Sequence, residues 1–318
     1  MITLNQKRAT TLSIALCCCV FLVQPVKAQS EADALAAIKL ATNPTTKLAA
    51  AEDFVAKFPQ SNARLSVAEL VAAELQKIKN GAVALALLER AQAVFTATQE
   101  REVLKPVALT AYVLGNRPDE AFTLAGEMLA KNPDDVAVLA RMTQLGAEEA
   151  RKRNQKYADV SLQYGLKAIA LIEADKKQAH DKDLGQLYQQ TAILYLAAGN
   201  TQEARSRLEK ATALSPLDPG NFALLGRVIS ADYVTEFSAY ESMPDGKAKQ
   251  DEARRLEVVL DAMIDNYAHA AGLATGRAEY QTLLQQVIPD LTTYYKRRNG
   301  SIKGLQELIR RYSVADLR

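Results

Sequence analysis

The segment GQLYQQTAILYLAAGNTQEARSRLEKATALSPLD, residues 185–218, decides the fold predicted for this chain. Its first half carries apolar or small side chains three, one and three residues apart, and this spacing places them on one face of a helix. These side chains belong to Tyr188, Thr191, Ala192 and Tyr195. The first half is therefore predicted to form a short amphipathic helix.

A turn and a second helix follow within the same segment. Gly199 and Asn200 are predicted to end the first helix, because both residues tolerate the left-handed backbone of a helix stop. Thr201 is the expected N-cap of the second helix, with an acid close behind it at the positive end of the helix dipole. Pro216 ends the second helix, and the packing face of that helix carries Ala204, Leu208 and Ala211.

A second copy of the pattern lies one period further along the chain. The residues found 34 positions after the first set are Phe222, Leu225, Gly226 and Ile229. This order of aromatic, large and small residues, with a period of about 34, resembles the tetratricopeptide repeat. Thr191 departs from the repeat pattern, which has a large apolar residue at that place. The small residues let the helices of one hairpin, and of the next, approach closely.

The resemblance implies an all-α fold, a right-handed α–α superhelix or solenoid of about seven helical hairpins. It covers residues 29–318. The composition is rich in alanine, leucine, glutamate and lysine, which also favours helix. Asn/Gly pairs separate apolar-periodic helices at residues 80–81, 115–116, 199–200 and 299–300. The clearest repeats are residues 102–135, 185–218 and 219–272.

Two stretches do not fit the regular period. Pro133 and Pro216 are 83 residues apart, against 68 for two periods. The extra residues are assigned to a long helix at 136–153 and to a polar connection at 175–182. A second insert, residues 233–250, contains Ser-Met-Pro-Asp-Gly and is predicted to be a loop.

Residues 1–28 have the layout of a secretory signal peptide. Lys7 and Arg8 precede a twelve-residue apolar run, and Val26-Lys27-Ala28 offers small residues at the spacing of a cleavage site. The run is shorter than the roughly 20 residues of a spanning helix. We therefore expect export to a bacterial periplasm, without a membrane span in the mature chain. Release from the cell and retention as an N-terminal anchor are the alternatives.

Cleavage after Ala28 changes the composition of the mature chain. It removes all three cysteines, three of the 39 basic residues and none of the 37 acidic ones, which leaves a net charge of about −1. The basic character of the precursor is therefore no argument for a nucleic-acid partner.

Motifs for catalysis and for cofactor or metal binding are missing from the sequence. His180 and His269 are far apart, and neither has a histidine partner at helical spacing, whereas a zinc site needs three or four ligands. No nucleophile elbow and no phosphate-binding loop occurs. The sequence predicts no catalytic residue, no cofactor and no metal ion, and a protein that is not an enzyme.

The C-terminal stretch, residues 296–318, holds seven Lys or Arg residues against two acidic ones. One interpretation is a peripheral contact with an acidic protein or an anionic lipid surface. The other, which we favour, is the solvated cap that repeat arrays need at their ends. The stretch lacks the interleaved aromatic platform of single-strand binders, so we expect no nucleic-acid partner.

In tetratricopeptide arrays the first helix of each hairpin lines a concave surface that binds peptides or protein segments. The resemblance implies such a surface here. The positions expected to face inward lie on the third, fifth and sixth hairpins: Thr110, Val113, Gln186, Gln189, Ile193 and Arg227. These side chains are mostly neutral and partly apolar, which suits a helical or extended segment of a partner.

The expected function is that of a non-catalytic scaffold or adaptor for protein–protein interaction in the bacterial cell envelope. Two alternatives stay open. One is a structural subunit of an envelope assembly or secretion complex. The other is a carbohydrate-binding or enzyme accessory protein that uses residues 233–250.

The signal-peptide interpretation predicts the start of the mature protein. Mass spectrometry of the exported chain should find Gln29 as its first residue, because Ala28 ends the cleavage site. Detection of the intact Met1 would indicate an uncleaved anchor instead.

Overall fold

The computed structural model describes residues 30–175 and 181–313. Within these residues the chain is all-helical, with 14 α-helices, one short 3-10 turn and no strand. No helix in this part of the chain is long and apolar enough to cross a membrane. The predicted signal peptide and His180 lie outside the described residues.

The helices follow one another through short connections. Those of the first half are α1 (Glu31–Leu40), α2 (Pro44–Lys57), α3 (Arg64–Leu75), α4 (Gly81–Val94), α5 (Thr98–Leu114), α6 (Pro118–Lys131) and α7 (Val136–Arg151). Those of the second half are α8 (Ala158–Ala174), α9 (Asp181–Ala197), α10 (Thr201–Leu214), α11 (Pro219–Glu241), α12 (Lys247–Ala274), η1 (Ala278–Tyr280), α13 (Gln281–Asn299) and α14 (Leu305–Arg311).

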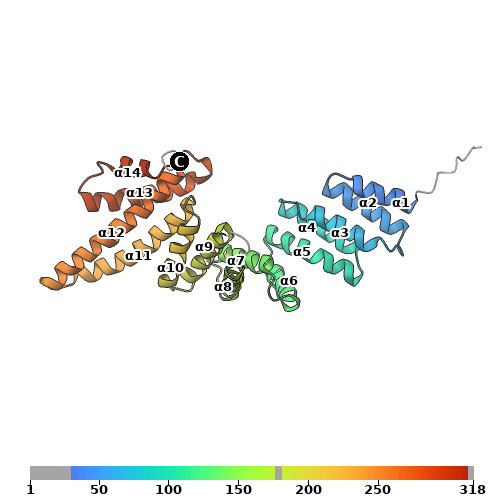
Figure 1. Cartoon of the computed structure of the whole chain (residues 1–318), viewed down its shortest axis with the longest axis horizontal. Coiled ribbons are helices and arrows are strands. Elements are labelled where there is room, and N and C mark those ends of the chain that lie inside the picture. Colours follow the sequence, from blue (N-terminus) through green and yellow to red (C-terminus); the bar gives the residue numbers. More distant parts are fainter. Residues whose placement is uncertain (1–29, 176–180, 314–318) are drawn as a thin grey trace, which may run out of the picture.

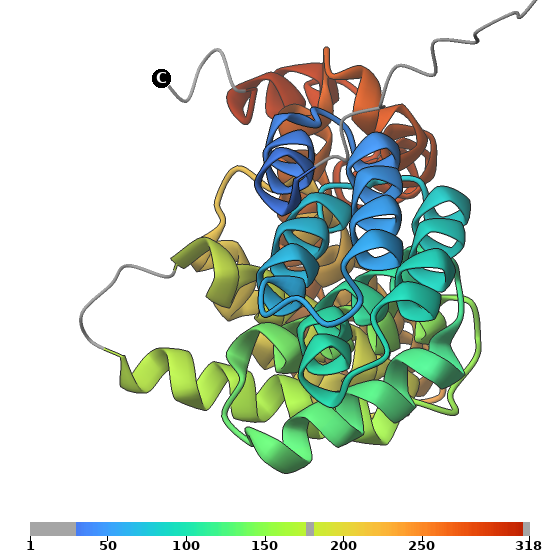
Figure 2. The same ribbon diagram turned by 90° about the vertical axis from the view of Figure 1, so that its right-hand side faces the viewer.

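The helices pack in neighbouring pairs. Each helix from α1 to α12 contacts the next one in the chain, and contacts also join helices two apart, such as α3 with α5, α7 with α9, and α11 with α13. Figure 1 shows the resulting elongated body, with α1 and α2 at one end and α11 to α14 at the other. Figure 2 views the molecule from the end that carries α1 to α5.

Buried apolar side chains form successive clusters along this body. Helices α1 to α5 enclose the first cluster around Phe54, α5 to α10 the second around Leu139, and α9 to α14 the third around Tyr267. Because α5, α9 and α10 each contribute to two clusters, they join one cluster to the next. Each helix pair is therefore stabilised mainly by its neighbours.

The segment 185–218 forms the predicted hairpin, α9 and α10. Gly199 has a φ of +75°, the left-handed conformation expected at the end of α9. Thr201 is not the N-cap, and this part of the prediction is wrong. Asn200 caps α10, because its Oδ1 accepts a hydrogen bond from the backbone N–H of Glu203 at 3.1 Å.

Small buried residues bring three helices together in the middle of the chain. A Cβ atom at Gly165 of α8 would lie 2.6 Å from Cγ2 of Thr191 in α9 and 2.7 Å from Cγ2 of Thr143 in α7. Both threonines are fully buried and donate their hydroxyls to carbonyls of their own helices. A larger residue would push these helices apart. This explains why Thr191 stands where the repeat pattern has a large apolar residue.

The other Asn/Gly turns lie between helices, as predicted. Asn80 caps α4 with its side chain. A Cβ atom at Gly81 would lie only 2.1 Å from the carbonyl oxygen of Leu114, so glycine permits the contact between α4 and α5. Asn116 and Gly300 adopt positive φ values of 55° and 72°.

The long helix predicted at residues 136–153 is confirmed. Its counterpart, α7, ends two residues earlier than expected, at Arg151. The polar connection predicted at residues 175–182 falls largely outside the described residues.

The loop predicted at residues 233–250 is corrected by the structure, because only residues 242–246 lie outside helices. On either side of this turn α11 and α12 continue as one long hairpin, which projects at one end of the molecule in Figure 1. Tyr233, Phe237 and Tyr240 recur at helical spacing, and neighbouring rings contact each other. The extra residues of this repeat therefore lengthen two helices.

The close approach of α9 and α10 can be tested at Ala204, which is fully buried. Ala204→Leu should overpack the hairpin and lower the free energy of unfolding by about 1–3 kcal/mol, measured by urea denaturation. Ala213→Leu is the matched control, because Ala213 is exposed on the same helix and its replacement should have little effect. Equal stability of both variants would contradict the packing of this hairpin.

Candidate functional site

Three hollows follow one another along the odd-numbered helices. The first lies between the α3–α5 region and α7, with a volume of about 360 Å³. The second lies between α7 and α9, with about 470 Å³. The third is lined by α7, α9, α11, α12 and α13, with about 440 Å³. We call the surface formed by these hollows the odd-helix surface.

The first two hollows adjoin each other. Ala137 and Arg141 of α7 line both of them. Thr110, predicted as an inward residue, lines the first hollow, and its hydroxyl donates to the carbonyl of Pro106 at 3.0 Å. Gln186, also predicted, is exposed and lines the second hollow.

The third hollow contains two of the predicted residues, Gln189 and Arg227. Gln189 is held by the protein itself, because its Nε2 donates to Oδ1 of Asn221 at 2.6 Å. Arg227 is exposed and shares the hollow with Arg151, Asp290 and an apolar wall from α11 and α13. This hollow is suited to a segment with both an acidic and an apolar side chain.

The remaining two predicted residues serve packing. Val113 is half-buried and packs against the second apolar cluster. Ile193 is only 6% exposed and packs in a small cluster with Ala147 and Ala158. Its apolar character points to this role, because an exposed helix position rarely requires a β-branched side chain.

The odd-helix surface carries three arginines without ion pairs. Within the described residues, Arg141, Arg151 and Arg227 form no salt bridge. Most other arginines do, as in the pair between Arg64 and Glu100 at 2.7 Å. An exposed guanidinium without an internal carboxylate keeps its hydrogen-bonding capacity for a ligand.

Arg151 lies in a desolvated setting although its side chain reaches the surface. Surrounding atoms remove water from the guanidinium and lower its pKa, while the carboxylates of Glu148 and Asp218 oppose that shift. Arg151 is also the last residue of α7, where a positive charge interacts favourably with the negative end of the helix dipole. The spacing of Arg141 and Arg151 along one helix gave no hint that each lines a hollow.

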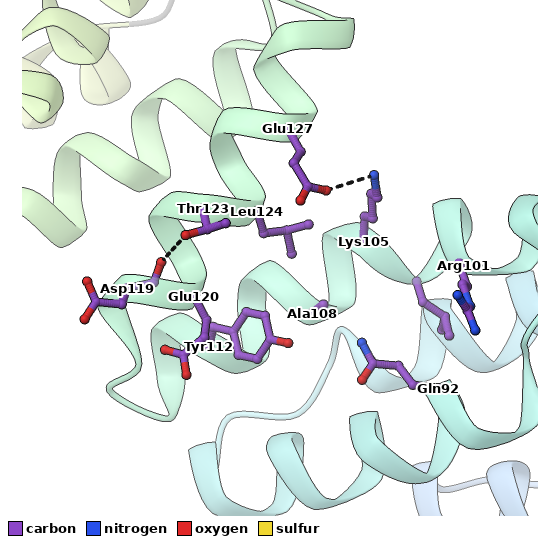
Figure 3. A pocket seen from close by; sticks show the side chains of 11 residues that line it. Gln92, Arg101, Lys105, Ala108, Tyr112, Asp119, Glu120, Thr123, Leu124 and Glu127 are labelled. Atoms are coloured by element: carbon purple, nitrogen blue, oxygen red, sulfur yellow. Dashed lines mark hydrogen bonds and ion pairs between the residues drawn. The ribbon is translucent and has the colours of Figure 1, made fainter.

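A larger hollow lies elsewhere, between α4, α5 and α6, with a volume of about 780 Å³ (Figure 3). Its charged groups are largely paired within the protein. Lys105 lies 3.1 Å from Glu102 and 3.4 Å from Glu127, and these carboxylates raise the pKa of Lys105. Arg101 is the exception, since it forms no ion pair with any described residue. This hollow offers fewer free groups to a ligand than the odd-helix surface.

The basic C-terminal stretch also uses part of its charge internally. Arg298 pairs with Asp261 at 2.8 Å, and Arg310 pairs with Glu307 at 2.9 Å. The guanidinium of Arg297 lies 3.8 Å above the ring of Phe237. Such pairing reduces the charge available for a lipid or protein surface.

His269 is not a free surface histidine. Its ring stacks between Phe222 and Tyr312, with centroid distances of 3.8 and 4.2 Å. Burial lowers the pKa of His269, while the nearby Asp265 carboxylate opposes this shift. In the part of the chain that the structure describes, no group of three or more possible ligands could hold a metal ion.

A scan against models of known protein families finds no match, and a search of curated proteins finds no similar chain. The tetratricopeptide resemblance therefore depends on the residues of this chain alone.

The stacked histidine predicts a pH dependence of stability. The folded protein favours neutral His269, so the unfolded chain binds a proton at higher pH than the folded chain does. Stability should therefore fall as the pH drops below about 6.5. His269→Phe keeps a flat ring in the stack without a titrating group, and should flatten the profile measured by urea unfolding between about pH 5 and 8.

His180→Gln is the control for this experiment, because it removes the only other histidine of the chain. It should leave the pH profile unchanged. A profile that stays steep in His269→Phe would show that another group is responsible.

Proposed function

We propose that this chain is a non-catalytic scaffold of the bacterial cell envelope that binds an acidic segment of another protein on the odd-helix surface. The observation that carries the proposal is a row of three hollows with unpaired arginines, the first two of which adjoin each other. The walls of these hollows contain Arg141, Arg151 and Arg227. A guanidinium group binds a carboxylate through two parallel hydrogen bonds, in a bidentate geometry.

A row of hollows along successive helices suits a linear ligand. A single deep cavity would suit a small molecule, whereas these hollows are open, and the first two share the wall residues Ala137 and Arg141. Apolar side chains lie beside the arginines, including Leu187 in the second hollow and Leu224 in the third. A segment with alternating acidic and apolar residues would contact both kinds of group.

We further propose that the helices form a right-handed, tetratricopeptide-like superhelix of about seven hairpins. Residues at equivalent positions of successive repeats support this arrangement, because they have the same packing role. Tyr188 and Phe222 are both buried, and Gly226 allows Tyr267 to approach so closely that a Cβ atom would lie 2.9 Å from its ring. Each helix contacts mainly the next helix in the chain and the one after that, which also agrees with a linear array.

The localisation of the scaffold is proposed from residues 1–28 of the sequence. The signal-like residues 1–28 suggest export, and the periplasm is the compartment that we propose. Membership in an envelope assembly is compatible with the same surface, which would then hold a neighbouring subunit.

Carbohydrate binding is the second candidate, because aromatic residues gather on the α11–α12 hairpin. Tyr233, Phe237 and Tyr240 line a small hollow there with Arg297. The guanidinium of Arg297 covers the ring of Phe237, so a sugar would have to displace it before stacking on that ring. We rank this function second for that reason.

Site-directed crosslinking in envelope fractions tests the proposal. A photoreactive benzoylphenylalanine in place of Gln186 or of Arg227 should crosslink to a partner protein, because both side chains line hollows. The same residue in place of Ser206 is the control, since Ser206 is exposed on α10 away from the hollows. Added salt should reduce the yield at the two test positions.

Equal yields at all three positions would contradict a specific odd-helix surface. A yield that is insensitive to salt would contradict an acidic partner.

A further inference from the structure

We propose that the turn between α13 and α14, residues 300–304, docks this chain on an anionic phospholipid surface. The side chain of Ile302 would enter the boundary between the lipid headgroups and the acyl chains. The ammonium groups of Lys296 and Lys303 would face the phosphates. This contact is separate from the odd-helix surface and does not depend on what that surface binds.

Ile302 is the first observation that points to a ligand. It is 58% exposed, and its side chain belongs to none of the apolar clusters in the described part of the chain. Turns are made mostly of glycine, proline, asparagine, aspartate and serine, each for a backbone reason that isoleucine does not share. Neither packing nor turn geometry therefore accounts for an isoleucine at this position.

The turn presents its tip in a fixed geometry. Gly300 and Gly304 have φ values of +72° and +90°, a conformation that favours glycine. The phenol of Tyr295 donates a hydrogen bond to the carbonyl of Lys303 at 3.0 Å. Leu305, directly after the turn, is buried in the cluster of α9 to α14. A tip that is already ordered loses little conformational entropy when it enters a surface.

The second observation is the charge around this tip. Residues 296–313 contain six Lys or Arg residues and one acid, Glu307, which is paired within α14 at 2.9 Å. Lys296 and Lys303 are exposed and form no ion pair with any described residue. Lys296 lies one helical turn before Gly300, since its carbonyl accepts a hydrogen bond from the N–H of Gly300 at 2.8 Å. Both lysines therefore flank the tip, and their charge is available to an anionic surface.

Other exposed apolar side chains lack this combination. Leu217, 56% exposed in the turn between α10 and α11, precedes Asp218. Val258, 68% exposed on α12, follows Glu257. A single exposed apolar side chain is common on proteins and needs no ligand. An apolar tip together with unpaired basic side chains is the combination that binds anionic membranes.

A lipid surface fits this tip better than an acidic protein does. Specific protein partners bury about 800 Å² on each side, whereas a lipid surface accepts a narrow tip. Helices α13 and α14 both pack on α12 at one end of the elongated body (Figure 1). A broad, flat surface can therefore approach them from that end.

A single tryptophan tests the contact, because the chain has none of its own. Ile302→Trp in the mature chain is mixed with vesicles of phosphatidylglycerol and phosphatidylcholine in equal parts. Its fluorescence maximum should move to shorter wavelength, since the indole leaves water for the headgroup region. Leu217→Trp is the matched control and should show no shift, because its turn carries an acid instead of lysines. Vesicles of phosphatidylcholine alone should shift neither variant.

Flotation with the same vesicles measures affinity. Lys296→Gln combined with Lys303→Gln should weaken binding by about tenfold or more, and Ile302→Ser by about tenfold. Lys39→Gln combined with Lys79→Gln is the charge-matched control and should bind as the wild type does, because both exposed lysines lie in the α1–α4 part of the chain. Added salt should also weaken binding. The melting temperatures should stay unchanged, since the altered side chains are exposed.

Three results would overturn the proposal. One is an unchanged fluorescence maximum of Ile302→Trp with the anionic vesicles. Another is equal binding of the wild type to anionic and to neutral vesicles. The third is retention of the wild type on polyglutamate beads but not by vesicles, which would assign the turn to an acidic protein. Crosslinking at Gln186 and Arg227 reports separately on the odd-helix surface, so these results leave the scaffold proposal in place.

Discussion

Close contact between neighbouring helices, made through small buried side chains, is the constraint on which this structure depends. At Gly165 three helices meet, and the methyl groups of Thr143 and Thr191 occupy the space that a Cβ atom would take. A similar close contact joins α11 and α12, where the ring of Tyr267 packs directly against Gly226. Side chains packed this tightly leave helices few alternative separations. The spacing between α7 and α9, and with it the second hollow, follows from these contacts.

The pairing of charged side chains differs between the odd-helix surface and the rest of the described surface. Away from the odd-helix surface, cations are commonly paired between or along helices, as in Arg64 with Glu100 or Arg90 with Glu52. In the hollows Arg141, Arg151 and Arg227 have no such partner among the described residues. Exposed ion pairs contribute little to stability, so their absence costs the fold little. It leaves the guanidinium groups free for recognition, which is why we connect these hollows with an acidic segment.

Part of the candidate site was predictable and part was not. Repeat spacing led to Thr110, Gln186, Gln189 and Arg227, and all four line hollows. The same spacing also selected Ile193, which is buried, because periodicity gives the face of a helix but not the depth of the next helix over it. No pattern distinguished Arg151, whose side chain lines the third hollow. That property exists only once the surrounding helices are in place.

The sequence by itself determined the helices and the turns between them. Periodicity and helix-stopping residues such as Gly199 and Asn200 act through neighbours a few positions away, so they can be recognised without a structure. The tertiary structure decided which side chains are covered and which remain open. It also decided that residues around the 242–246 turn lengthen two helices, because α11 and α12 pack on each other there, with Arg255 of α12 paired to Glu236 of α11 at 2.9 Å. Burial, pairing and hollows depend on residues distant in the chain, and local spacing carries no information about them.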